Sequence, residues 1–291
     1  MTWLVKWSFR FLSALPLWAL HALGWLGGWV TFVTSTRYRH RLLMHAAQAG
    51  LSAQQIRQSV GEAGKMMAEI PRLWLGHPVP IGWAGESAIE RAQTLGQGLM
   101  LLTPHMGCFE IIAQAYAERF GDQQPITVLF RPARQPWLRD WVARGRQRAN
   151  LHTAPTNLAG VKQLIKALKQ GQTVGLLPDQ VPPAGQGVWA PYFGRQAYTM
   201  TLSARLAHSG QALPVFLWGE RLPWGRGFVV HVRSVGLPSG SALSKDPQEA
   251  ATQINAAMET LVRERPEQYL WSYARYKSPK GSAAADTDTI G

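Results

Sequence analysis

Cysteine is almost absent from this chain, because Cys108 is its single thiol. A disulfide framework is therefore excluded, and the composition fits a reducing compartment. Acidic residues are also scarce: 17 Asp and Glu stand against 30 Lys and Arg, a formal net charge of +13. This excess indicates an anionic partner, which could be nucleic acid, anionic lipid or an acidic protein. With 291 residues and 46% hydrophobic side chains, disorder of the whole chain is excluded.

The N-terminal segment has no acidic residue before Glu62, and Phe11–Thr36 contains no Asp, Glu, Lys or Arg. About 20 apolar residues are enough to cross a bilayer core. Tryptophan, which prefers the headgroup region, is concentrated here at Trp3, Trp7, Trp18, Trp25 and Trp29. We therefore expect residues 1–45 to form a hydrophobic, membrane-anchoring helical segment.

Whether this segment spans the bilayer or lies in its interface stays open at this stage. A buried pair of helices is the competing interpretation, since Pro16 and Gly27-Gly28 could break the segment. A cleaved signal peptide is disfavoured, because the apolar stretch runs directly into Arg37 without a small-x-small cleavage site.

The rest of the chain alternates strand and helix patterns. Short apolar runs predict strands at Gly98–Thr103, Ile126–Phe130, Thr173–Leu177, Leu213–Trp218 and Phe228–Val232. Helices are predicted after Ser52, around Val161–Leu168, and after the capping sequence Asp246-Pro247-Gln248-Glu249. This alternation predicts an α/β fold with a mostly parallel mixed sheet flanked by helices, covering residues 46–277. Residues 278–291 are small and polar, and we expect a disordered tail.

Polar residues follow three of these strands. His105 comes after the first, Arg131 after the second and Asp179 after the third. Ligands of open parallel sheets bind beyond the carboxyl ends of the strands. The three side chains therefore mark a candidate site.

His105 and Glu110 form an H-x4-E pattern that suits acid–base chemistry. With His105 on a turn and Glu110 in the first turn of the next helix, the carboxylate could accept from one imidazole nitrogen. The other nitrogen could then take a proton from a substrate hydroxyl. Arg146, or another arginine between 131 and 148, could stabilise the resulting oxyanion.

Other uses of these residues are weaker. A zinc site lacks a partner histidine at H-E-x-x-H spacing. Cys108, three residues after His105, could be a thiol nucleophile, although a lone cysteine is more often a small core residue. A membrane-tethered nucleic-acid binder would use the positive charge, but the chain has no recognisable binding motif for one.

An ordered set of motifs resembles a known family. The set is His105-x4-Glu110, Arg131-Pro132, Gly145-Arg146-Gln147-Arg148-Ala149-Asn150, Pro178-Asp179-Gln180 and Pro266-Glu267-Gln268-Tyr269-Leu270-Trp271. Together with the apolar N-terminus, it resembles the late lipid A acyltransferases (lauroyl and myristoyl transferases) of Gram-negative inner membranes. These belong to the lysophospholipid acyltransferase superfamily, whose fold is glycerol-3-phosphate acyltransferase-like.

The resemblance implies transfer of a fatty acyl chain from acyl-acyl carrier protein to a hydroxyl of a lipid A precursor of the Kdo-lipid IVA type. It places the catalytic domain on the cytoplasmic face of the inner membrane and requires no metal or organic cofactor. His105 would be the general base and Glu110 its orienting partner. Arg146 and Asp179 match positions that the family treats as essential, and Arg131 and Arg148 match its recurrent arginines.

The sequence departs from the wider superfamily at two places. Pro104 stands where glycerolipid acyltransferases usually carry Asn, and Glu110 stands where they carry Asp, which argues against a glycerol-phosphate acceptor. Gln180 follows Asp179 in place of the family's frequent continuation, so another acceptor lipid, such as an aminolipid or a glycolipid, stays an alternative.

Overall fold

The computed structural model describes residues 2–130, 148–233 and 243–281. Its centre is a seven-stranded sheet with the order β1-β9-β8-β2-β5-β3-β4. Every neighbouring pair is parallel except β8 and β9, which are antiparallel. The strands are β1 (Ile81–Ala84), β2 (Leu99–Leu102), β3 (Ile126–Phe130), β4 (Leu151–Pro155), β5 (Thr173–Leu176), β8 (Leu213–Arg221) and β9 (Phe228–Arg233). The predicted mixed sheet is thus confirmed.

A two-stranded antiparallel ribbon, β6 (Gly187–Tyr192) and β7 (Arg195–Met200), lies outside the main sheet. The helices after the N-terminal region are α5 (Ile70–Leu75), α6 (Ser87–Thr94), α7 (Phe109–Phe120), α9 (Leu158–Lys169), α10 (Leu202–Gly210) and α11 (Pro247–Glu264). Short 3-10 turns occur at η1 (Pro223–Gly225) and η2 (Pro266–Gln268).

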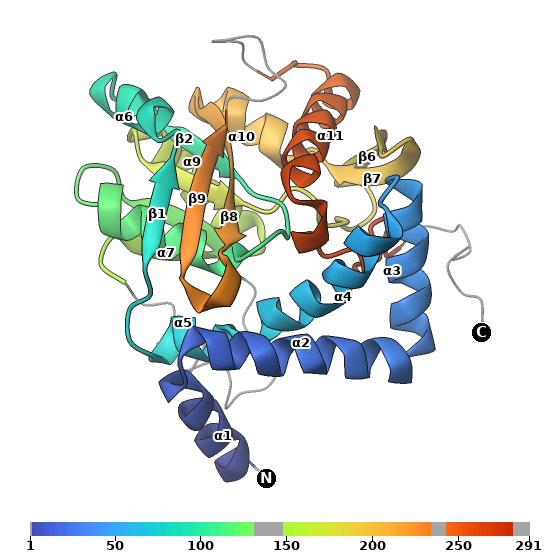
Figure 1. The fold of residues 1–291 in the computed structure, drawn as a ribbon. Coiled ribbons are helices and arrows are strands. Elements are labelled where there is room, and N and C mark those ends of the chain that lie inside the picture. The colour runs from blue at the N-terminus through green and yellow to red at the C-terminus, as the bar shows by residue number, and fades with distance from the viewer. Residues whose placement is uncertain (1, 131–147, 234–242, 282–291) are drawn as a thin grey trace.

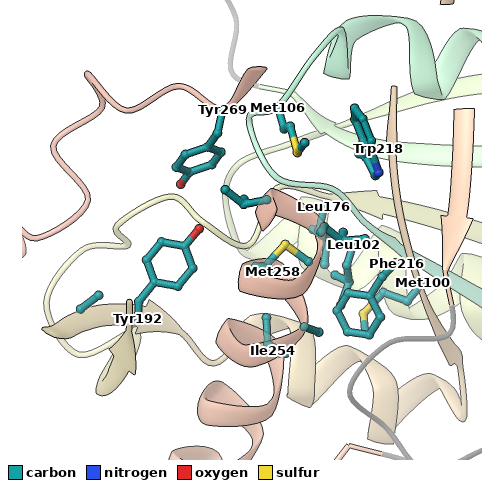
Figure 2. Close-up of a cluster of buried hydrophobic side chains, with 14 of the residues drawn as sticks. Met100, Leu102, Met106, Leu176, Tyr192, Phe216, Trp218, Ile254, Met258 and Tyr269 are labelled. Atoms are coloured by element: carbon teal, nitrogen blue, oxygen red, sulfur yellow. The ribbon is translucent and has the colours of Figure 1, made fainter. Parts of the chain in front are cut away.

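Alternating side chains of the central strands fill two cores, one on each face of the sheet. Leu99 and Leu101 of β2 pack with α6 and α7, whereas Met100 and Leu102 face α9, α10 and α11. Figure 2 shows the second core, where Met100, Leu102 and Phe216 of the sheet gather beside Ile254 and Met258 of α11. All four residues of β2 are buried, which explains why this strand is a continuous apolar run.

Several local expectations are confirmed. Ser52 and Gln55 form a capping box at the start of α4 (Ala53–Ala68). Asp246 caps α11 by accepting from the Glu249 amide. All five strands expected from apolar runs are present, whereas β1, β4, β6 and β7 were not predicted from the sequence. Residues 282–291 of the expected tail lie outside the described part of the chain.

The N-terminal segment forms α1 (Thr2–Ala14), α2 (Leu17–Thr34) and α3 (Thr36–Gln48). Pro16 separates α1 from α2, as its missing amide hydrogen favours. Among the residues described, no helix is both long enough and apolar enough to cross a membrane. Figure 1 shows α2 along one side of the domain, against α4.

Glycines allow α2 and α4 to pack with their backbones close together. A Cβ atom added at Gly64 would overlap the carbonyl oxygen of Gly24, and one added at Gly28 would overlap that of Val60. One face of α2 is therefore buried through small residues, together with Leu17, Leu20 and His21. Trp18, Trp25 and Val30 of the same helix remain exposed, although the Trp25 ring also packs on Gly61 of α4.

We predict that Gly64→Ala lowers the free energy of unfolding by about 1–3 kcal/mol, because the new methyl group forces the two helices apart. Gly27→Ala is the matched control, since an added Cβ there meets nothing within 4 Å. Thermal or urea unfolding measures both variants. Equal stability of Gly64→Ala and wild type would contradict the close α2–α4 packing.

Candidate functional site

His105 lies on the tight loop between β2 and α7, and this loop is held by backbone contacts. Gly107 has φ +54°, and a Cβ added there would overlap the carbonyl oxygen of Gly219. Its amide donates to the Gln268 carbonyl over 2.9 Å, and the Leu270 amide donates to the His105 carbonyl over 3.0 Å. The loop conformation therefore depends on glycine at 107 and on the segment 266–271.

The His105 side chain is oriented by Asp179. Its Nδ1 lies 2.8 Å from Asp179 Oδ1, and its backbone amide donates to Asp179 Oδ2 over 2.8 Å. The hydroxyl of Tyr269 donates to the same Oδ2 over 3.3 Å. Because an ionised carboxylate only accepts hydrogen bonds, Nδ1 carries the proton and the lone pair is on Nε2. This is the tautomer that a general base needs.

The expected pairing of His105 with Glu110 is replaced by this contact. Glu110 lies in the first turn of α7, as predicted, but its Oε2 accepts from Trp74 Nε1 over 3.2 Å. Asp179 follows β5, which pairs with β2, so its carboxylate reaches both the ring and the amide of His105. Glu110 acts on His105 through its charge.

The ionisation of the pair favours a basic imidazole. Burial opposes the charged form of His105, but the nearby Asp179 carboxylate, together with Glu110, raises its pKa above the usual value. Burial acts against Asp179 as well, yet the charge and hydrogen bonds of His105 hold the pKa of Asp179 below its usual value. The Asp179 side chain is 1% exposed and that of His105 is 12% exposed, so only the histidine is accessible.

A mainly apolar cavity of about 620 Å³ lies beside His105, lined by several of its neighbours. Gln180, whose Nε2 lies 3.1 Å from His105 Nε2, lines this cavity together with Phe109 and Glu110. The Phe109 ring centroid is 4.8 Å from that of His105. Aliphatic walls come from the sheet and α7: Leu101, Ile112, Ala113, Val128, Leu129 and Leu176. The volume lies within the range of small-molecule sites.

Of the three arginines predicted at this site, the structure describes only Arg148. Arg131 and Arg146 lie outside the described residues. Arg148 donates to the Leu73 carbonyl and to Gln114 Oε1, each over 3.2 Å. Because Gln114 lines the cavity, Arg148 joins α5 to the cavity wall on α7.

Cys108 does not have the environment of a nucleophile. It is 1% exposed, and burial together with the Glu69 charge raises the pKa of its thiol well above the usual value. A thiolate is therefore strongly disfavoured at this position. Within residues 2–130, 148–233 and 243–281, no three His, Cys, Asp or Glu side chains gather in a way that could hold a metal ion.

A buried ionic cluster behind the loop was not predicted from the sequence. Arg221 donates from Nη2 to Glu69 Oε1 over 2.7 Å and to the Gly107 carbonyl over 3.0 Å. Its other nitrogens reach Glu69 Oε2 and Glu62 Oε2 over 2.8 and 2.7 Å. His21 of α2 lies 3.2 Å from Glu69. The cluster thus joins the loop that carries His105 to α4 and α2, and no local sequence pattern around Arg221 or Glu69 signals it.

The Pro266–Trp271 segment, which the sequence marks only as a motif, supports the His105 loop through hydrogen bonds. Gln268 holds the Gly107 amide and also bonds the backbone amide and carbonyl of Arg221 through its side chain. Tyr269 donates to Asp179, and Figure 2 shows its ring beside Met106 of the loop. The segment therefore supports both members of the His105–Asp179 pair.

These features define a class: an α/β protein with an oriented histidine–carboxylate pair at the carboxyl edge of a parallel sheet, opening into an apolar cavity. The family model described as bacterial lipid A biosynthesis acyltransferase matches residues 1–278. The chain belongs to this family.

Among similar proteins, the lipid A biosynthesis lauroyltransferase of Escherichia coli (strain K12) is 31% identical over 202 residues, covering 68% of this chain and 62% of the relative. The palmitoleoyltransferase of the same organism is 27% identical over 206 residues, with 69% and 63% covered. The lipid A biosynthesis acyltransferase of Haemophilus influenzae is 25% identical over 193 residues, with 64% and 56% covered. The match therefore spans less than two thirds of each of these relatives.

We predict that the pKa of His105 lies above the reference value of about 6.5, and that Asp179→Asn lowers it. The substitution removes the negative charge that stabilises the imidazolium, so the ring loses its proton at a lower pH. NMR titration of the labelled imidazoles measures this, with His105→Ala to identify the resonance. Glu110→Gln is the comparison and should shift the pKa less. An unchanged titration in Asp179→Asn would contradict the pairing.

Proposed function

We propose that the protein is an O-acyltransferase that moves a fatty acyl chain from acyl-acyl carrier protein to a hydroxyl of a lipid A precursor of the Kdo-lipid IVA type. The observation that carries the proposal is the His105–Asp179 pair beside a mainly apolar cavity, with Gln180 between His105 Nε2 and that cavity's lining. Membership of the lipid A acyltransferase family supports the same assignment.

The reaction follows from the orientation of the imidazole. Nε2 of His105 takes the proton of the acceptor hydroxyl while that oxygen attacks the thioester carbonyl carbon. A carbon–oxygen bond forms and the carbonyl oxygen becomes negative. Collapse of this intermediate breaks the carbon–sulfur bond, and the leaving thiolate receives the proton from the imidazolium. Asp179 stabilises the imidazolium between the two proton transfers. The transfer needs no reactant besides the acyl donor and the acceptor hydroxyl, and His105 ends in its starting protonation state.

The remaining site residues receive supporting roles in this proposal. Glu110 increases the basicity of His105 through its charge. Arg146, with Arg131 and Arg148, supplies positive charge toward the oxyanion or the phosphates of the acceptor. The net charge of +13 favours both an acidic carrier protein and an anionic lipid. These partners place the enzyme at the cytoplasmic face of the inner membrane.

The aliphatic cavity is assigned to the acyl chain. Apolar side chains of the sheet and α7 form most of one side, Thr103, Glu110 and Gln180 lie near His105, and further polar residues line the rest: Thr153, Thr156, Asn157, Gln186, Thr201 and Arg205. A chain inserted from the end near His105 leaves its thioester carbonyl beside the imidazole. A hydrocarbon chain on the apolar side would displace water from these side chains, which favours its binding.

The central test is acyl transfer by purified protein, with a panel of acyl-acyl carrier proteins and a tetra-acylated lipid A precursor. We expect transfer by wild type and by Cys108→Ser, and a loss of about 10²–10⁴-fold in kcat for His105→Ala. Mass spectrometry of lipids from a deletion strain tests the acceptor. Loss of an acyl chain from an aminolipid or glycolipid, with lipid A intact, would contradict the proposed acceptor.

The cavity assignment gives a separate prediction. Ala113→Phe fills the cavity wall of α7, so the preferred donor should become shorter by several carbons, while transfer itself continues. Ala159→Phe is the matched control, because Ala159 is exposed on α9 and does not line the cavity. Competition between donors of different length measures the preference. An unchanged length profile in Ala113→Phe would place the acyl chain elsewhere.

A further inference from the structure

We propose that α1, α2 and the β8–β9 turn form one face that lies flat in the interface of an anionic bilayer. This interfacial face is defined by Trp3 and Trp7 of α1, Trp18 and Trp25 of α2, and Trp224 of η1. It deepens the proposed function, on which it rests for the lipid acceptor. The turn around Trp224 is the new element, because it lies some two hundred residues from the N-terminal helices in sequence.

Exposed aromatic residues of α1 follow the helical repeat. Trp3, Trp7 and Phe11 are spaced four residues apart, and they are 66%, 56% and 66% exposed. Residues four apart lie on the same side of a helix. An apolar stripe therefore runs along α1, and contiguous apolar surface of this kind marks a binding face.

The outward face of α2 continues the apolar surface. Trp18 and Val30 are exposed and Trp25 is half-exposed, whereas Gly24 and Gly28 are buried on α4. The Trp25 ring also packs on Gly61 of α4, and Trp29 packs against the core, so Trp18 is the α2 tryptophan that keeps most of its surface in solvent. A helix with one packed face and one exposed aromatic face fits a bilayer interface.

Trp224 extends this surface from a different part of the chain. It is 88% exposed and has φ +61°, a conformation that bulky residues rarely adopt. A Cβ added at the next residue, Gly225, would overlap the backbone nitrogen of Trp18. The turn therefore touches the start of α2, and Figure 1 shows the β8–β9 connection beside that helix. The unusual backbone holds an indole in solvent next to Trp18.

Side-chain chemistry identifies the occupant as a lipid surface. Indoles concentrate at the headgroup level, where the ring is apolar and the N–H can hydrogen-bond. Lys6, Arg10 and Arg226 are exposed around the face, and no acidic residue precedes Glu62. Basic side chains near an anionic bilayer are attracted to its surface. A neutral or acidic protein surface would not account for this combination of charge and tryptophan.

The face also has a direct connection to the site. The ring of Phe9 in α1 is 6.0 Å from that of Trp74 in α5, and Trp74 donates to Glu110 at the cavity. Contacts from both the N-terminal helices and a turn of the sheet would fix the rotation of the domain about the helix axes. The cavity would then keep one orientation toward the membrane that holds its acceptor.

The test uses the full chain with an environment-sensitive fluorophore at Trp224→Cys, compared with Trp189→Cys on β6. Trp189 is 43% exposed, and Figure 1 shows β6 far from α1 and α2. Cys108 is buried and remains unlabelled. With vesicles of phosphatidylethanolamine and phosphatidylglycerol, emission from position 224 should shift to shorter wavelength and be quenched by brominated lipids. Position 189 should respond to neither.

Vesicle sedimentation provides the second readout. Trp224→Ala should weaken partitioning about tenfold, and Trp189→Ala should leave it unchanged. Trp224→Asn, a residue that tolerates the left-handed backbone, serves as a second variant, and equal unfolding curves show that the fold is kept. Wild-type binding by both Trp224 variants, or a label at 224 that ignores vesicles, overturns the proposal. So does a dimer in solution that the Trp224 variants dissociate.

Activity on a detergent-dispersed acceptor separates this proposal from the proposed function. A Trp224 variant that keeps this activity but loses vesicle binding supports the interfacial face. If wild type transfers acyl chains to no acceptor, the proposed function fails, and the vesicle measurements still decide the interfacial face.

Discussion

The site depends on one interaction, in which the Asp179 carboxylate holds both the ring and the backbone amide of His105. The ring contact sets the tautomer, and the amide contact fixes the loop that carries the ring. Burying a carboxylate without charged or hydrogen-bonding partners costs free energy of folding, because burial disfavours its charged form. Here the charge is balanced by the imidazole and by hydrogen bonds from His105 and Tyr269. The same contact therefore supports the fold of the loop and the basicity of Nε2.

Around this pair, distant segments of the chain converge on the loop. Arg221 at the end of β8 bonds the Gly107 carbonyl and the Glu69 carboxylate of the N-terminal helical layer. Gln268 joins Arg221 to the Gly107 amide. Removing one partner from such a buried cluster leaves an uncompensated charge, which costs more than the loss of a surface ion pair. The loop that carries His105 is thus coupled to α2 and α4, although neither helix lines the cavity.

The sequence predicted the strand ends more reliably than the contacts between them. Continuous apolar runs located β2, β3 and β5, and these strands are neighbours in the sheet, so His105 and Asp179 were placed at one edge. The choice of Glu110 as the orienting carboxylate followed from its nearness in sequence. In the structure Asp179 holds this position instead, because it follows β5, which pairs with β2, the strand that precedes His105. Long-range partners such as Arg221 and Glu69 leave no local pattern, and short half-exposed strands such as β1 and β4 lack the periodicity that predicts them.

The N-terminal helices show why hydrophobicity alone could not define their role. The same apolar residues fit a spanning segment, a buried pair or an interfacial anchor. Gly24 and Gly28 bring one face of α2 close to the backbone of α4, the Trp25 ring packs on Gly61, and Trp18 stays exposed. Because Gly225 brings Trp224 to the start of α2, the exposed surface belongs to two parts of the fold. A surface assembled in this way has a fixed orientation relative to the sheet, and hence relative to His105. The proposed membrane contact and the proposed chemistry therefore have one orientation relative to each other within the fold.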